Sequence, residues 1–195
     1  RPRRSLEATW KYLLICSVGI ALALLGNILV SLALPVPAEI EGAHGSMRLS
    51  SLLALAPSMN PSWLKAGFIF LLVGYGTKMG LAPMHNWLPD AHSEAPSLVS
   101  ALLSGALLNC AFLGILRAYQ VCVAAGLAEF CGELLVCLGL LSMALAAVFI
   151  VGQGDFKRLL AYSSVEHMGI LALGTGLGGQ ALFGVMLHAV CHSLT

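Results

Sequence analysis

Long apolar runs, each about as long as a bilayer is thick, constrain this chain more than any other feature. Residues 10–34 and 127–151 are almost continuously apolar, and a helix needs about 20 such residues to cross the hydrocarbon core of a membrane. Of the 195 residues, 58% are hydrophobic and 10% are charged, whereas about a quarter of a soluble domain is charged. Too few charges remain to cover a water-facing surface. The sequence therefore predicts an all-α fold, a polytopic bundle of transmembrane helices.

Six apolar segments divide the chain, and we expect them to form one transmembrane domain over residues 1–195. The predicted helices are about 10–34, 62–81, 97–116, 127–151, 159–176 and 180–195. The segment 35–61 contains Glu39, Glu41, His44 and Arg48 and is predicted to be a loop, with LSSLLALA as a short interfacial helix. The basic clusters RPRR and GQGDFKR fall on one side of the membrane in this layout, as the positive-inside rule expects. The chain begins at Arg1 and ends inside an apolar pattern, so we expect a piece of a longer subunit.

Charge and cysteine usage exclude several other classes of protein. The formal net charge is +1, so no basic field indicates a nucleic-acid partner. None of the six cysteines forms a C-x-x-C pair, and all lie in or beside apolar runs, where small buried side chains are expected. The sequence GTGLGG follows an apolar helical segment rather than a strand, which argues against a phosphate-binding loop. We predict no cofactor and no metal ion.

Lys78 is the most informative ionisable residue. It follows GYGT and precedes MGLAP, a run of glycines and a proline that predicts a broken helix at membrane depth. A charged group there costs roughly 2.5–3.5 kcal/mol on insertion scales, so such residues are functional candidates. Burial disfavours the ammonium and a charged partner favours it. A lysine balanced between these effects can take up and release protons; the alternative is snorkelling to the headgroups.

Further polar residues fall inside predicted helices. Glu166 and His167 lie in AYSSVEHMG, and His188 and His192 are four residues apart, on one face of the last helix. That spacing suits a relay of imidazoles, ordinary packing or, as a weaker alternative, a metal. Asn109 lies midway along its helix and can bind either a water chain or a neighbouring helix.

The segment MHNWLPDAHSEAP is predicted to be a polar re-entry loop between two helices. Its tryptophan is assigned to the membrane interface, where this residue type is enriched. Asp90, His92 and Glu94 either form a point of proton uptake or belong to a solvated connection.

Three ordered motifs carry a family resemblance: GYGTKMGLAPMHNWLPDAHSEAPSLVSALLSG, DFKRLLAYSSVEHMG and HAVCHSLT. The chain resembles, from about Leu6 onward, the antiporter-like membrane subunits of respiratory complex I, of Mrp-type cation/proton antiporters and of membrane-bound hydrogenases. The motifs KMGLAPMHNWLPDAHSEAPS, ALLNC and SSVEHMG are most similar to the hydrogenase-4 component F type, which is related to formate hydrogenlyase.

The resemblance implies a subunit of about fourteen helices with two inverted repeats, of which this chain covers the sixth to the eleventh. Lys78 matches the lysine of the family's broken seventh helix, whose glutamate partner would precede Arg1. Asn109 stands where one branch has lysine, and Ser104 where another has histidine. Neither titrates, so the central relay would run through water or other side chains. His188 and His192 match histidines of the eleventh helix, and a further lysine is expected after Thr195.

The leading hypothesis is a proton-translocating subunit of a hydrogenase-4-like or NADH:quinone oxidoreductase-like complex in the plasma (inner) membrane of a bacterium or archaeon. The proton path would comprise Lys78, Glu166, His167, His188, His192 and Asn109. The chain would not be catalytic alone, and its partners would be the lipid bilayer, other membrane and peripheral subunits of the redox complex, and protons, with Na⁺ as the alternative ion. Two alternatives are a subunit of an Mrp-type cation/proton antiporter and a structural scaffold that has lost transport.

Overall fold

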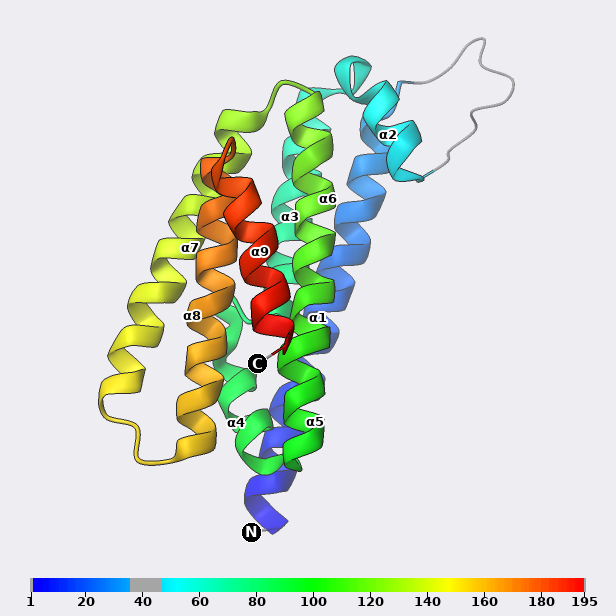
Figure 1. Cartoon of the computed structure of the whole chain (residues 1–195). Coiled ribbons are helices and arrows are strands. Elements are labelled where there is room, and N and C mark those ends of the chain that lie inside the picture. The colour runs from blue at the N-terminus through cyan, green and yellow to red at the C-terminus, as the bar shows by residue number, and fades with distance from the viewer. Residues whose placement is uncertain (1, 36–46, 195) are drawn as a thin grey trace.

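The computed structural model describes residues 2–35 and 47–194, and within these ranges the chain is helical with no β-strand. The long helices run roughly side by side along one common direction (Figure 1). This confirms the predicted all-α bundle. The loop residues Glu39, Glu41 and His44 lie outside the described residues. The α-helices are α1 Pro2–Ala33, α2 Leu49–Leu55, α3 Pro61–Met79, α4 Trp87–Glu94, α5 Ser97–Leu102, α6 Leu108–Ala124, α7 Ala128–Val151, α8 Phe156–Leu177 and α9 Ala181–Leu194.

Four stretches among the described residues are long and apolar enough to cross a membrane: Arg3–Ala33, Pro61–Glu94, Ser97–Ala124 and Ala128–Val151. Six spans were predicted. α9 has only 14 described residues. α8 has 22 residues but contains Lys157, Arg158, Glu166 and His167, which lower its hydropathy. The chain is nevertheless an integral membrane protein by the number and apolarity of its helices.

Glycines allow two helix pairs to pack backbone against backbone. A Cβ at Gly74 of α3 would lie 2.5 Å from a backbone nitrogen of α1, and a Cβ at Gly139 of α7 would lie 2.7 Å from a backbone nitrogen of α8. Both distances are too short for any larger residue. Small residues at such crossings are typical of membrane helices, because helices associate there through close van der Waals packing. The pairs α1–α3 and α7–α8 are therefore the two tight units of the bundle.

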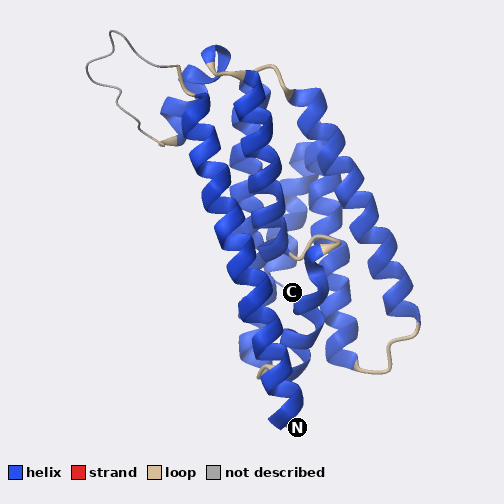
Figure 2. Cartoon of the chain, turned by 180° about the vertical axis from the view of Figure 1, so that it is seen from behind, coloured by secondary structure: helices blue, strands red, loops and turns tan. Residues whose placement is uncertain are grey.

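The chain between α3 and α4 lies inside the bundle rather than at either end (Figure 2). α3 ends where Gly80 adopts a left-handed conformation (φ 80°), and Leu81 and Ala82 are fully buried. A 3₁₀ turn at Met84–Asn86 leads into α4. The predicted break near Lys78 within a membrane stays a prediction, because it depends on where the bilayer lies.

Several predicted helix ends were wrong. The first helix begins at Pro2, not at about residue 10, because PRRSLEA continues the helix and Glu7 pairs with Lys11 one turn later at 2.7 Å. The helix predicted to end at residue 116 continues to Ala124 and stops before Gly126, whose φ is 77°. A charged residue, Arg117, suggested the end of a span, but it lies within α6.

The helix that contains α5 and α6 includes one irregular turn. Leu103–Leu107 forms a π-helix between them, a feature that often occurs at functional sites in helical proteins.

Candidate functional site

Lys78 lies in the last turn of α3, half-buried against α1. Its Nζ donates a hydrogen bond of 3.2 Å to the hydroxyl of Tyr12 and lies 4.8 Å from the centre of the Tyr12 ring. The thiol of Cys16, one turn further along α1, also lies beside it. The amine is therefore held inside the bundle by side chains of one neighbouring helix.

Three histidines come together between α8 and α9. The ring centroid of His167 lies 5.1 Å from that of His188 and 5.0 Å from that of His192. The i, i+4 spacing of the last two puts both on the face of α9 that meets α8. Nδ1 of His167 and Nε2 of His188 are buried without a hydrogen-bond partner among the described residues. Within residues 2–35 and 47–194, no set of three His, Cys, Asp or Glu side chains is arranged to hold a metal ion.

Asn109 extends this cluster towards α6. Its Nδ2 donates to the carbonyl of Gly105 (2.9 Å) and to Oγ of Ser193 (2.8 Å), the residue that follows His192. One turn away in the π-helix, the hydroxyl of Ser104 lies 2.9 Å from that of Ser164 on α8. The imidazoles, Asn109 and these serines form a set of polar groups, which we name the α6–α8–α9 polar seam.

Lys78 and the polar seam are separate. Among the described residues, the polar contacts of Lys78 are with Tyr12 and Cys16 of α1, not with an imidazole. Glu166 is half-buried on α8 beside His167, and the described part of the chain contains no ion pair for it. A proton passing between Lys78 and the seam would therefore need water or side chains outside the described residues.

Asp90 joins three helices instead of lying in a solvated loop. Its carboxylate accepts a hydrogen bond of 2.9 Å from Lys11 of α1 and one of 3.0 Å from Arg158 of α8. Lys157 adds a bond of 2.9 Å to the carbonyl of Ala95. We call Asp90, Lys11 and Arg158 the ionic brace. It closes the end of the bundle where α4 meets α1 and α8.

The segment predicted to be a re-entry loop is mostly helix. Asp90, His92 and Glu94 lie on α4, and His92 is only 5% exposed. Trp87 was assigned to the membrane interface and is instead fully buried, with its Nε1 donating to the carbonyl of Thr77 at 2.7 Å. The reason is that the Asp90 carboxylate and the Trp87 indole find partners on other helices, so polarity did not indicate exposure here.

Tyr12 and Lys11 were missed at the sequence level. Both looked like the edge of an apolar span, where tyrosine and lysine are common. The adjacent polar residues Lys11 and Tyr12 could have indicated a functional position, because both lie inside one continuous helix.

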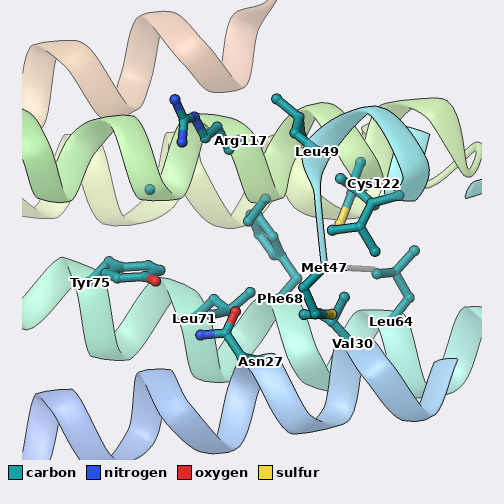
Figure 3. Close-up of a pocket in the computed structure, with 14 residues that line it drawn as sticks. Asn27, Val30, Met47, Leu49, Leu64, Phe68, Leu71, Tyr75, Arg117 and Cys122 are labelled. Atoms are coloured by element: carbon teal, nitrogen blue, oxygen red, sulfur yellow. The ribbon is translucent and has the colours of Figure 1, made fainter. Parts of the chain in front are cut away.

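A cavity of about 240 Å³ lies between α1, α2, α3 and α6 (Figure 3). Its lining is mostly apolar, with Leu64, Phe68 and Leu71 of α3 among the residues drawn. Asn27, Tyr75 and Arg117 contribute the polar groups. None of the predicted site residues lines it, although Tyr75 is only three residues before Lys78.

The fold and these polar groups define a class: a polytopic α-helical membrane subunit with ionisable residues inside its bundle. Such residues are rare and mark ion and proton pathways in membrane proteins. The chain belongs to the family described as "NADH:quinone oxidoreductase/Mrp antiporter, TM", whose profile matches residues 1–195.

Particular relatives fit the resemblance stated from the motifs. The chain is 47% identical to the hydrogenase-4 component F homolog of Methylacidiphilum infernorum over 100% of its own length and 41% of that protein. It is 38% identical to NADH-quinone oxidoreductase subunit N of Deinococcus radiodurans, covering 92% of this chain and 36% of that one. A subunit of an archaeal respiratory membrane complex, the membrane-bound sulfane sulfur reductase, superposes with a TM-score of 0.84 at 25% identity, over 98% of this chain and 37% of that chain. The chain thus spans about two fifths of the length of these relatives.

Proposed function

We propose that this chain is the central part of a proton-translocating, antiporter-like subunit in a hydrogenase-4-like or NADH:quinone oxidoreductase-like complex of a bacterial or archaeal plasma membrane. Redox chemistry in other subunits would drive it, and the chain would carry no redox group of its own. The observation that carries this proposal is the placement of Lys78: a half-buried amine at the end of α3, bound to a tyrosine hydroxyl inside an apolar bundle.

The polar seam supplies the rest of the path. A proton moves between groups about 2.6–3.2 Å apart or through one water, and the pairs Ser104–Ser164 and Asn109–Ser193 have such spacings. His167, His188 and His192 would accept and release protons. Glu166, next to His167 in the sequence, would belong to the same proton path. The buried ring nitrogens without partners are places where water would complete the path. For Asp90, His92 and Glu94, the role in proton uptake remains part of the proposal.

The test is the substitution Lys78→Met in the full-length subunit, assembled in its complex and reconstituted into vesicles. We expect electron transfer to continue and proton translocation to be lost. Lys65→Met is the matched control, because Lys65 lies on the same helix but over the Phe130 ring (5.0 Å) near the other end of α3. Unchanged translocation in Lys78→Met would remove Lys78 from the mechanism.

Two other functions have specific support. The family includes Mrp antiporters, so a sodium gradient that drives proton movement in vesicles without electron transfer would favour cation/proton antiport. The non-titrating side chains of Asn109 and Ser104 suit a structural scaffold. A scaffold role would be favoured if the intact complex moved ions equally well with Lys78 and with Lys78→Met.

A further inference from the structure

One turn of α1 contacts both sides of the interruption between α3 and α4. On the α3 side, Tyr12 accepts the hydrogen bond from Lys78. On the α4 side, the same ring meets Trp87 edge to face, with centroids 5.3 Å apart and an interplanar angle of 63°. The neighbouring residue, Lys11, pairs with Asp90 of α4. These contacts join two helical segments that are not continuous with each other.

Trp87 also contacts Thr77, the residue that precedes Lys78 in α3. Trp87 donates through Nε1 to the carbonyl of Thr77 at 2.7 Å. Near the C-terminus of a helix, carbonyls lack their usual intrahelical partner. The Thr77 carbonyl accepts a long bond of 3.3 Å from the backbone nitrogen of Gly80, and the indole supplies a second, shorter one. Lys78, Tyr12, Trp87 and Thr77 thus form a closed set of contacts around the end of the helix.

Tyrosine suits both protonation states of a lysine. Its hydroxyl accepts a hydrogen bond from an ammonium and can donate one to a neutral amine. Its ring attracts only the cation. A phenylalanine would keep the ring and lose the hydroxyl, so the amine would have no such partner once it released its proton.

We propose that Tyr12 is a positioning residue for proton transfer at Lys78: it holds the amine in both protonation states and, through Trp87, fixes the amine relative to α4. This rests on the proposed function, in which Lys78 carries the proton. Tyr12 needs no titration of its own in this role, because a hydroxyl can exchange donor for acceptor by rotating its O–H bond.

The experiment compares Tyr12→Phe and Tyr12→Leu in the full-length subunit within its complex. At matched electron-transfer rate, we expect Tyr12→Phe to slow proton translocation roughly tenfold, the order expected when one hydrogen bond to a charged group is lost. The amount of assembled complex should be unchanged. Tyr12→Leu removes the ring as well, and it should slow translocation further and lower the yield of complex.

Tyr75→Phe is the matched control. The substitution also removes one hydroxyl, and Tyr75 lies on α3 itself. Its ring, however, packs towards α6, where a Cβ added at Gly114 would lie 3.2 Å from it. Wild-type translocation in this variant is the expected result. Wild-type translocation in Tyr12→Phe, or a loss proportional to the loss of assembled complex, would overturn the proposal for Tyr12.

A second measurement does not depend on transport. Thermal unfolding midpoints of the purified full-length subunit are compared for Tyr12→Phe, Lys78→Met and the double variant. Residues in direct contact give non-additive changes, so the double variant should lose less than the sum of the single losses. Additive losses would contradict the contact. If Lys78→Met pumps normally while the cycle is non-additive, the proposed function fails and the Tyr12–Lys78 contact stands.

Discussion

Replacing Asp90 with asparagine tests whether the ionic brace is structural. The substitution removes the negative charge that pairs with Lys11 and Arg158 and keeps the size of the side chain. Asp90 is 23% exposed, and its two partners are 43% and 40% exposed. The Asp90–Arg158 pair, at this exposure, contributes about 0.2–1 kcal/mol. Lys11 would keep its contact with Glu7, so the loss should come from the Arg158 pair and stay within about 1 kcal/mol.

The assay is the thermal unfolding midpoint of the full-length subunit in detergent, measured at about 0.05 M and about 0.5 M salt, since salt screens exposed charges. Asp90→Asn should lower the midpoint at low salt, and high salt should reduce the difference from wild type. Glu94→Gln is the control, because Glu94 lies on the same helix without an ion pair in the described part of the chain. A midpoint equal to wild type at both salt concentrations would refute the structural role. Lost translocation at unchanged stability would instead support proton uptake through Asp90.

Four further substitutions follow from the packing and the polar contacts. Gly139→Ala should destabilise the subunit by about 1–3 kcal/mol through overpacking, measured by thermal unfolding. Gly184→Ala on α9, where an added Cβ meets nothing within 4 Å, should leave stability unchanged or raise it slightly. Trp87→Phe should cost about 0.5–1.5 kcal/mol, since the Thr77 carbonyl loses the indole donor and keeps the backbone N–H of Gly80; equal denaturation curves for the variant and wild type would contradict this. Asn109→Leu should reduce proton translocation in vesicles more than it reduces the yield of complex.

The helices themselves were predictable because a bilayer imposes one length on every apolar span. The i, i+4 spacing of His188 and His192 likewise predicted a shared helix face. It could not predict that His167 completes the cluster, because the approach of α8 to α9 is set by side-chain packing between segments. Hydropathy along a sequence contains no information on that approach.

The segment around Trp87 shows why polar sequences are harder to interpret. MHNWLPDAHSEAP has the composition of a solvated connection. In the fold, Asp90 finds cations 79 and 68 residues away in the sequence, and Trp87 finds a carbonyl at the end of α3. A buried polar group is stable when it is paired, and the pairing is a property of the tertiary structure. Composition therefore predicted exposure where the fold provides partners.

The arrangement of the bundle also bears on how protons would pass from Lys78 to the imidazoles. Lys78 belongs to the tight α1–α3 pair, and the imidazoles lie where α9 meets the α7–α8 pair. α6 contacts both sides. It presents Asn109 to the second, and the π-helical turn that precedes it presents Ser104 to the same side. Since hydroxyls and water pass protons along hydrogen bonds without a stable charge of their own, and an amide can hold such a water in place, a non-titrating residue at 109 is compatible with transport. The buried Oδ1 of Asn109, which has no partner among the described residues, is where such a water would bind. On the proposed function, then, the relay depends on hydration around α6 and not on a second lysine there.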